Sequence, residues 1–141
     1  MGCLTRSVFK ALDLSVSPPR PVALKRFFPR KTDGISISSL KEIDHLRQAR
    51  SPQVVPLRDV AFKDEDGVCY IVLVFDYLPH DLLGVARRGV RFTPRCVRSL
   101  FREIVRGVAD LHAQGLVHRD IKSNVISCKH FVEQRAKGGR R

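Results

Sequence analysis

The chain has 141 residues, and 26 lysines and arginines outweigh 14 aspartates and glutamates to give a formal net charge of +12. That length suits one domain of ordinary size, and a hydrophobic content of 43% is enough for a folded core, which argues against wholesale disorder. No apolar run reaches the roughly 18 residues of a membrane span, and no secretory signal pattern opens the sequence, so we expect neither a membrane protein nor a secreted one.

The cysteines indicate a reducing compartment. The four of them, Cys3, Cys69, Cys96 and Cys128, lie far apart and form no C-x-x-C pair. This spacing argues against a zinc ribbon and against a disulfide scaffold. We therefore expect an intracellular protein of the nucleus or cytoplasm.

The first third of the chain is predicted to form strands and one helix. Alternating apolar residues predict a weak strand over 7–11 and a second strand over 21–28. Apolar residues at helical spacing then predict a helix over 36–48. Either Ser36 or Ser38 is available as its N-cap.

Two further strands are predicted next, over 54–62 and 68–76. The second is the most strongly β-favouring segment of the chain because it is rich in β-branched and aromatic residues. Residues 63–67 are polar and end in glycine, so they read as a turn-forming linker. The two strands are therefore expected to form a hairpin.

The remainder of the chain is predicted to be helical. A short helix is expected over 81–86 and a long one over 93–114. Thr93 can cap the long helix, Pro94 stands at its first position and Gly115 ends it.

The long helix is predicted to carry a basic stripe opposite an apolar face. The stripe consists of Arg91, Arg95, Arg98, Arg102 and Arg106, and the opposite face of Val97, Leu100, Phe101, Ile104, Val108 and Leu111. A solvated face is the expected interpretation of the stripe, and a surface for phosphate or an acidic partner is the alternative. Nucleic-acid binding is not expected, because there is no tryptophan and there are two tyrosines to stack on bases.

A motif with chemistry follows the long helix. The sequence His118-Arg-Asp-Ile-Lys-Ser-Asn124 resembles the catalytic loop of the protein-kinase family, H-R-D-x-K-x-x-N. Three similar segments precede it in the family's order. Val22-Ala-Leu-Lys25 resembles the strand motif V-A-I-K, Glu42 follows on the first predicted helix, and residues 73–78 resemble the hinge.

The resemblance is more specific to the cyclin-dependent kinases. The segment from Gly34 to Glu42 is similar to that group's signature G-x-P-x-[ST]-[AS]-[IL]-R-E, with Ser36 in place of the proline and Lys41 in place of the arginine. In the family this helix contacts a cyclin. The resemblance therefore implies a possible cyclin partner through the helix around Leu40 and Glu42, and a protein substrate.

The resemblance implies an α+β, protein-kinase-like fold. Residues 1–78 would form the N-lobe, an antiparallel sheet plus one helix, whose first strand and glycine-rich loop are incomplete. Residues 79–126 would form part of the helical C-lobe through the catalytic loop. Residues 127–141 are expected to be a disordered basic tail.

The resemblance implies ATP and Mg²⁺ as cofactors. Lys25 would bind the α- and β-phosphates while Glu42 holds it in place. The small Ala23 would leave room for adenine, the backbone of Asp76 and Leu78 would hydrogen-bond it, and Asp81 would contact ribose. Without the order of motifs, Lys25 and Glu42 would be read as a surface ion pair and Phe75 as core. The residues implied to bind nucleotide are Val8, Ala23, Lys25, Glu42, Phe75 as gatekeeper, Asp76, Leu78 and Asp81.

The catalytic residues implied are Asp120, Lys122 and Asn124. Asp120 would accept the proton of a Ser or Thr hydroxyl, and Lys122 would neutralise charge on the transferred phosphoryl group. Asn124 would be a metal ligand, whereas His118 and Arg119 are expected to hold structure. The implied activity is transfer of the γ-phosphoryl group of ATP to protein Ser or Thr.

The sequence also departs from the family pattern. Asn124 stands four residues after Asp120, where the family has five, and one residue of extended chain spans about 3.5 Å. We therefore expect Asn124 to miss the metal unless the loop repacks. No Asp-Phe-Gly sequence is present, so the truncated 141-residue polypeptide is expected to have little activity alone. The alternative is a non-catalytic fragment that binds a cyclin or another partner.

Overall fold

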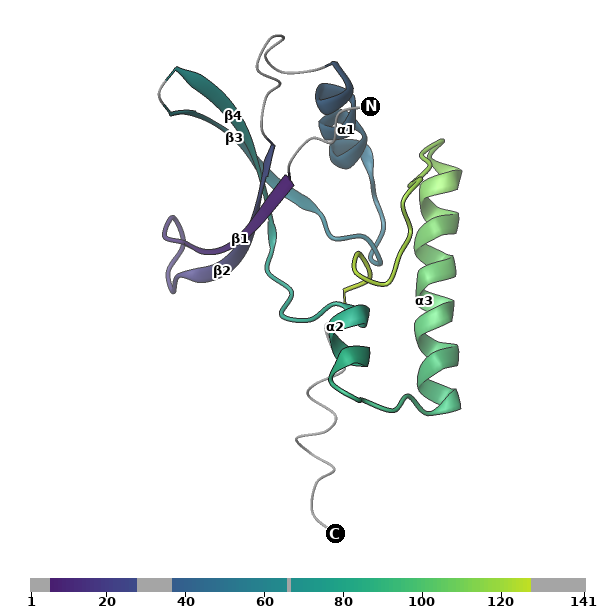
Figure 1. Cartoon of the computed structure of the whole chain (residues 1–141). Coiled ribbons are helices and arrows are strands. Elements are labelled where there is room, and N and C mark those ends of the chain that lie inside the picture. The colour runs from purple at the N-terminus through teal and green to yellow at the C-terminus, as the bar shows by residue number, and fades with distance from the viewer. Residues whose placement is uncertain (1–5, 28–36, 66, 128–141) are drawn as a thin grey trace. The chain divides into compact units, whose positions relative to one another are not determined.

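A computed structural model of the chain describes residues 6–27, 37–65 and 67–127. The chain divides after Tyr77 into two compact units, each of which is described by itself. In chain order the elements are β1 (Arg6–Asp13), β2 (Arg20–Phe27), α1 (Ile37–Gln48), β3 (Leu57–Glu65), β4 (Val68–Asp76), α2 (Leu82–Arg87) and α3 (Pro94–Ala113) (Figure 1).

The first unit is built on an antiparallel sheet with the strand order β1-β2-β4-β3. The most apolar strand, β4, lies inside the sheet between β2 and β3, whereas β1 and β3 form its edges (Figure 1). Central strands are covered on more sides than edge strands, so β-branched and aromatic residues are favoured there. The expected hairpin of the last two strands is confirmed.

The core of this unit lies between α1 and one face of the sheet. The side chains of Phe27, Ile71 and Leu73 are at most 4% exposed and form one cluster with Ile43 of α1. Leu46, one turn further along α1, packs against the same cluster. This spacing of three residues lets a single helical face cover the sheet.

The second unit contains α2, α3 and the segment that follows them. Thr93 caps α3, because its side-chain oxygen accepts a hydrogen bond of 3.3 Å from the backbone N–H of Cys96, and Pro94 is the first helical residue. Gly115 has a positive φ of 72°, a conformation that glycine adopts without steric cost. The start and the end of the long helix are therefore as the sequence predicts.

The expected apolar face of α3 is only partly covered. Leu111 is buried and Ile104 is half-buried, but Val97 is 52% exposed and Phe101 is 66% exposed. An exposed apolar ridge on a helix favours association with another surface.

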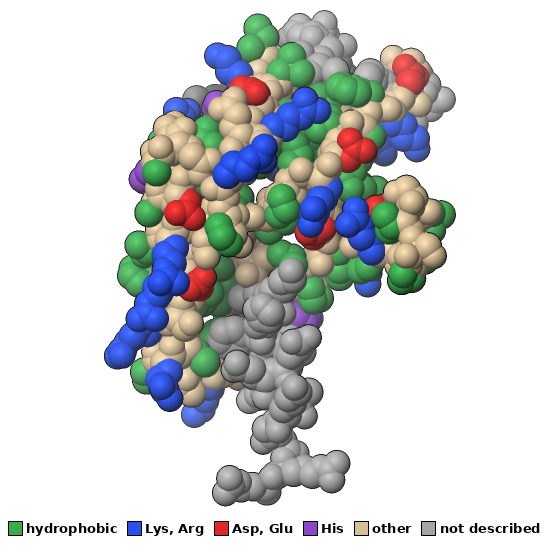
Figure 2. Space-filling view, turned by 180° about the vertical axis from the view of Figure 1, so that it is seen from behind, with side chains coloured by type: hydrophobic (Ala, Val, Ile, Leu, Met, Phe, Trp, Pro, Cys, Tyr) green, Lys and Arg blue, Asp and Glu red, His purple; other side chains and the backbone are tan. Residues whose placement is uncertain are grey.

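The expected basic stripe is exposed to solvent. Figure 2 shows arginine side chains gathered along α3. Arg106 forms an ion pair of 3.1 Å with Glu103, whereas Arg95, Arg98 and Arg102 bond to none of the side chains described. The stripe is a solvated, strongly positive face.

The α+β interpretation is confirmed, but several element bounds differ from the expected ones. Residues 63–65 of the expected linker belong to β3, which continues to Glu65, while β4 begins at Val68 as expected. Edge strands tolerate charged residues, so a run of polar residues does not end such a strand.

The helix α1 begins at Ile37, so Ser38 lies inside it, and Ser36 lies outside the described residues. Residues 1–5, in the region of the partial glycine-rich loop, and most of the basic tail, 128–141, also lie outside them. Among the helices described, none is long and apolar enough to cross a membrane.

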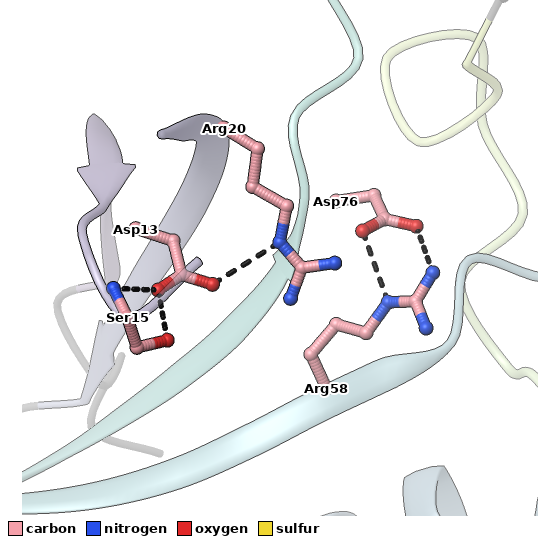
Figure 3. A network of polar contacts seen from close by, with 5 residues as sticks. All are labelled: Asp13, Ser15, Arg20, Arg58 and Asp76. Atoms are coloured by element: carbon pink, nitrogen blue, oxygen red, sulfur yellow. Dashed lines mark hydrogen bonds and ion pairs between the residues drawn. The ribbon is translucent and has the colours of Figure 1, made fainter. Parts of the chain in front are cut away.

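The connection from β1 to β2 is organised by Asp13. Its carboxylate accepts hydrogen bonds of 2.6 Å from the Ser15 hydroxyl, 3.0 Å from the Ser15 backbone N–H and 3.1 Å from Nε of Arg20 (Figure 3). These donors favour the charged carboxylate and lower the pKa of Asp13, with the Ser15 hydroxyl as the largest cause.

We predict that Asp13 makes the stability of the fold sensitive to acid. A carboxyl whose pKa is lowered by folding stabilises the native state fully above its ordinary value of 3.8, and this contribution disappears as the pH falls through the lowered folded value. Chemical unfolding followed from neutral pH into the acid range should therefore show a smaller acid-induced loss of unfolding free energy in Asp13→Asn. Ser15→Ala should reproduce most of this effect, and an acid limb identical to that of the wild type in both variants would contradict the prediction.

Candidate functional site

Four residues expected to line a nucleotide site lie on one face of the sheet. Val8 pairs with Lys25 across β1 and β2, and Ala23 pairs with Phe75 across β2 and β4. Residues directly opposite each other point to the same face, and so do residues two apart on a strand. Val8 is 67% exposed, whereas Ala23 and Phe75 are half-buried. The register thus brings the four together on the face that α1 also covers.

An ion pair joins β2 to α1 at this face. Nζ of Lys25 lies 3.1 Å from Oε1 of Glu42, and the two side chains are 26% and 30% exposed. The same ammonium lies 5.0 Å from the ring centroid of Phe27, which adds a cation–π contact. A lysine ammonium has three donors, so the bond to Glu42 leaves others to meet an anion.

A second ammonium lies on the same face and was not singled out from the sequence. Lys10 stands two residues after Val8 and pairs with Ala23. Its Nζ lies 4.5 Å from the ring centroid of Tyr77. The two-residue period of β1 is the signal that would have identified it.

At the end of β4, the side chain of Asp76 is engaged by an arginine. Nε and Nη2 of Arg58 donate to its two carboxylate oxygens at 3.0 Å and 2.6 Å (Figure 3). The hydrogen bonds to Asp76 are the largest cause that raises the pKa of Arg58. With its carboxylate held in this way, Asp76 offers a ligand mainly its backbone, which is the part expected to meet adenine. Nothing in the sequence pattern singles out Arg58.

Leu78 and Asp81 belong to the second unit. Leu78 is half-buried. Asp81, assigned to ribose by resemblance, is the N-cap of α2, where its Oδ1 accepts from the backbone N–H of Gly84. The short helix therefore begins one residue later than expected. The cap uses one carboxylate oxygen, so Asp81 has a structural role besides the one that the resemblance implies.

The catalytic-loop residues form a local cluster after α3. Nζ of Lys122 lies 2.9 Å from Oδ2 of Asp120, and the two side chains are 51% and 59% exposed. The backbone N–H of Asp120 donates to Nδ1 of His118 at 3.2 Å. Arg119 has a φ of 63°, in the left-handed region that residues other than glycine seldom adopt.

Asn124 is not part of this cluster. It is exposed in the turn closed by a bond of 3.0 Å from the N–H of Val125 to the carbonyl of Lys122, and it bonds to none of the side chains described. Within residues 6–27, 37–65 and 67–127, no group of three histidine, cysteine or acidic side chains is placed to hold a metal ion. The described residues therefore do not form a magnesium site by themselves.

The catalytic loop is tied back to the start of α2. The N–H of Leu82 donates to the carbonyl of Ile126 at 2.8 Å, and that of Leu83 donates to Ser123 at 3.1 Å. An isolated bridge pairs Asp81 with Ser127. Figure 1 shows the segment after α3 returning to α2. The first residues of α2 thus fix the backbone just beyond Asp120.

Comparison with known proteins matches residues 7–133 to the protein kinase domain. The match extends past residue 126, where the resemblance of the motifs ends. The chain is 33% identical to the probable cyclin-dependent kinase 8 of Dictyostelium discoideum over 84% of this chain and 32% of that protein. It is 34% identical to the CTD kinase subunit alpha of Schizosaccharomyces pombe, over 74% of this chain and 18% of that protein. Cyclin-dependent kinase 12 of Caenorhabditis elegans is 35% identical over 74% of this chain and 16% of that protein. The chain spans a third or less of these relatives.

We predict that removing the α2 cap loosens the catalytic loop. Asp81→Ala should cost about 1 kcal/mol of local stability and lower the hydrogen-exchange protection of the Leu82 and Leu83 amides, which donate to the loop. Thr93→Ala removes the equivalent cap of α3, so it is the matched control and should leave both amides protected. Equal protection of Leu82 and Leu83 in the wild type and Asp81→Ala would show that the cap does not hold the loop.

Proposed function

The chain belongs to the protein kinase domain family, and on this premise we propose that it carries the ATP-binding and catalytic-loop residues of a cyclin-dependent type of Ser/Thr kinase. The observation that carries the proposal is the ion pair of 3.1 Å between Lys25 and Glu42. It fixes a lysine that retains free donors on the face where Ala23 and Phe75 leave an apolar wall. A cation held beside an apolar wall suits the phosphates and the base of a nucleotide.

In this proposal ATP binds along the inner face of the sheet. Lys25 donates to the α- and β-phosphates while Glu42 keeps its ammonium in place, and Lys10 adds positive charge on the same face. Val8 and Ala23 contact adenine, and Phe75 limits the depth of the pocket. The backbone groups of Asp76 and Leu78 hydrogen-bond the base, and Asp81 contacts ribose.

The proposed reaction uses Asp120 and Lys122. Asp120 accepts the proton of a Ser or Thr hydroxyl as the hydroxyl oxygen bonds to the γ-phosphorus, and the bond from that phosphorus to the β–γ bridging oxygen breaks to release ADP. Lys122, whose ammonium already lies 2.9 Å from Asp120, neutralises charge on the transferred group. Kinases generally use Mg²⁺ with ATP. The described residues supply no cluster of metal ligands, and Asn124, the proposed ligand, is not part of the cluster of Asp120 and Lys122. The proposed roles of Asp120 and Lys122 therefore involve no metal ion.

We predict that the 141-residue polypeptide binds ATP but transfers little phosphate. It contains no Asp-Phe-Gly sequence, which in the family supplies the main magnesium ligand. Lys25→Ala should weaken ATP binding by about tenfold or more, because it removes a charge-assisted contact to phosphate. Calorimetric titration with ATP would measure this loss, with Lys41→Ala as the control that removes an exposed α1 charge.

Two results would count against this prediction. Strong Mg²⁺-dependent phosphorylation of a protein by the pure polypeptide would overturn the expected low activity. Equal affinity for ATP in the wild type, Lys25→Ala and Lys41→Ala would overturn the nucleotide site.

A second candidate function is non-catalytic binding of a cyclin. On α1, Ile37 and Leu40 are 73% and 49% exposed in the first turn of the helix, whereas Ile43 in the next turn is buried. Exposed apolar residues three positions apart on a helix form a ridge that another protein can cover. Several relatives are named cyclin-dependent kinases, and this ridge lies in the segment that resembles their signature.

This alternative predicts that the exposed ridge controls capture by a cyclin. Leu40→Ser should reduce binding in a pull-down with purified cyclins, because it removes an apolar contact without touching the core. Phe62→Ser is the matched control, since Phe62 is an apolar residue of edge strand β3 that is 62% exposed. Equal capture of both variants and the wild type would exclude this ridge as the cyclin contact.

A further inference from the structure

The pair formed by Arg58 and Asp76 is a two-point contact between side chains of the sheet. Both carboxylate oxygens of Asp76 are engaged by one guanidinium, through Nε at 3.0 Å and Nη2 at 2.6 Å (Figure 3). Such a two-point contact fixes the plane and the direction of both groups, which a single ion contact does not. The pair therefore restrains the orientation of Asp76 as well as its charge.

An irregularity in β3 makes this contact possible. Leu57 pairs with Phe75 and Asp59 pairs with Val74, so Arg58 is an additional residue between two ladder positions. A bulge of this kind redirects a side chain and ends regular pairing. Here the redirected side chain reaches the last residue of β4, where the chain leaves the sheet.

The contact lies on the sheet face opposite the proposed nucleotide site. Asp76 follows Phe75 directly, so their side chains point to opposite faces, and Asp76 pairs with Val22, the residue before Ala23. Arg58 therefore has no access to a nucleotide on the inner face. Any influence of Arg58 on that nucleotide passes through the backbone of Asp76.

We infer that Arg58 is a positioning residue for adenine recognition: by holding the Asp76 carboxylate, it fixes the backbone that donates to and accepts from the base. This inference rests on the proposed function, because that function assigns the backbone of Asp76 to adenine. The pairing of Asp76 with Val22 restrains the same backbone from the β2 side. The end of β4 is thus held from two sides at the residue whose backbone would hydrogen-bond adenine.

A purely stabilising role is the alternative, and the geometry disfavours it. The side chains of Arg58 and Asp76 are 44% and 30% exposed, and exposed ion pairs contribute little to global stability. A second arginine–aspartate pair in the same sheet provides a direct comparison. Arg20 bonds to Asp13 at 3.1 Å, and the two arginines are similarly exposed, but this pair joins the end of β1 to the start of β2 (Figure 3).

The test compares base recognition with phosphate recognition. Dissociation constants for ATP, GTP and inorganic tripolyphosphate would be measured on the 141-residue chain by displacement of a fluorescent ATP analogue. Arg58→Ala should weaken ATP binding by about tenfold, the value of one well-formed hydrogen bond, and should leave tripolyphosphate unchanged. The preference for ATP over GTP should fall in parallel. Arg20→Ala should bind all three ligands as the wild type does.

Two further variants separate positioning from folding. Arg58→Lys keeps the charge but loses the two-point contact, so it should show a partial loss of ATP affinity in a protein of unchanged melting temperature. In an Asp76→Asn background, Arg58→Ala should add little, because the contact it removes is already weakened.

Any of the following results would overturn the inference that Arg58 positions the backbone of Asp76. Parallel losses of ATP and tripolyphosphate, or equal losses in Arg58→Ala and Arg20→Ala, would mean a general structural role. Unchanged ATP affinity in Arg58→Ala, beside a wild type that binds ATP, would reject the positioning role and leave the proposed function intact. A wild type that binds none of the three ligands would reject the proposed function itself, and the inference with it.

Discussion

The register of β2 within the sheet is the constraint on which the candidate site depends. Because side chains alternate along a strand, a slip of one residue would turn Ala23 and Lys25 to the opposite face. They would then no longer share a face with Val8 and Phe75, and Lys25 would point away from Glu42. The register is itself fixed by apolar burial, since Phe27 must enter the cluster beneath α1. The core thus selects the register, and the register assembles the site.

The helix α1 couples the same core to the charge of the site. Ile43 is buried against the sheet, and Glu42, its neighbour in sequence, lies at the edge of that contact, where it reaches Lys25. A displacement of α1 would therefore separate the ion pair while exposing apolar surface. Leu40, one turn before Ile43, is 49% exposed, so a partner bound there would act on the position of α1 and with it on Glu42. Both proposed functions therefore depend on α1, ATP binding through Glu42 and cyclin binding through Leu40.

The sequence predicts those features whose cause is local, and the family resemblance supplied the roles that the residues alone left open. The bounds of β4 follow from its run of β-branched and aromatic residues, and the start of α3 follows from Thr93 and Pro94. Features with a distant cause were missed. The contact of Arg58 needs a bulge and a partner 18 positions away, neither of which has a sequence signal. The cap by Asp81 was missed although its cause is local, because the helix was expected to begin at Asp81 and not after it.

The two lysine–carboxylate pairs differ in burial, and this difference matches the roles proposed for them. Lys25 and Glu42 are each at most 30% exposed and lie beside the core, so water competes with their contact only weakly. Lys122 and Asp120 are each more than half exposed, where an ion pair is worth about 1 kcal/mol or less. In the proposed reaction, Lys122 can therefore leave Asp120 for the transferred phosphoryl group at little cost. The backbone beyond Asp120 stays in place, because Leu82 and Leu83 hold the carbonyls of Ile126 and Ser123. A fixed lysine suits a phosphate that stays bound, and an exchangeable one suits the phosphoryl group that moves.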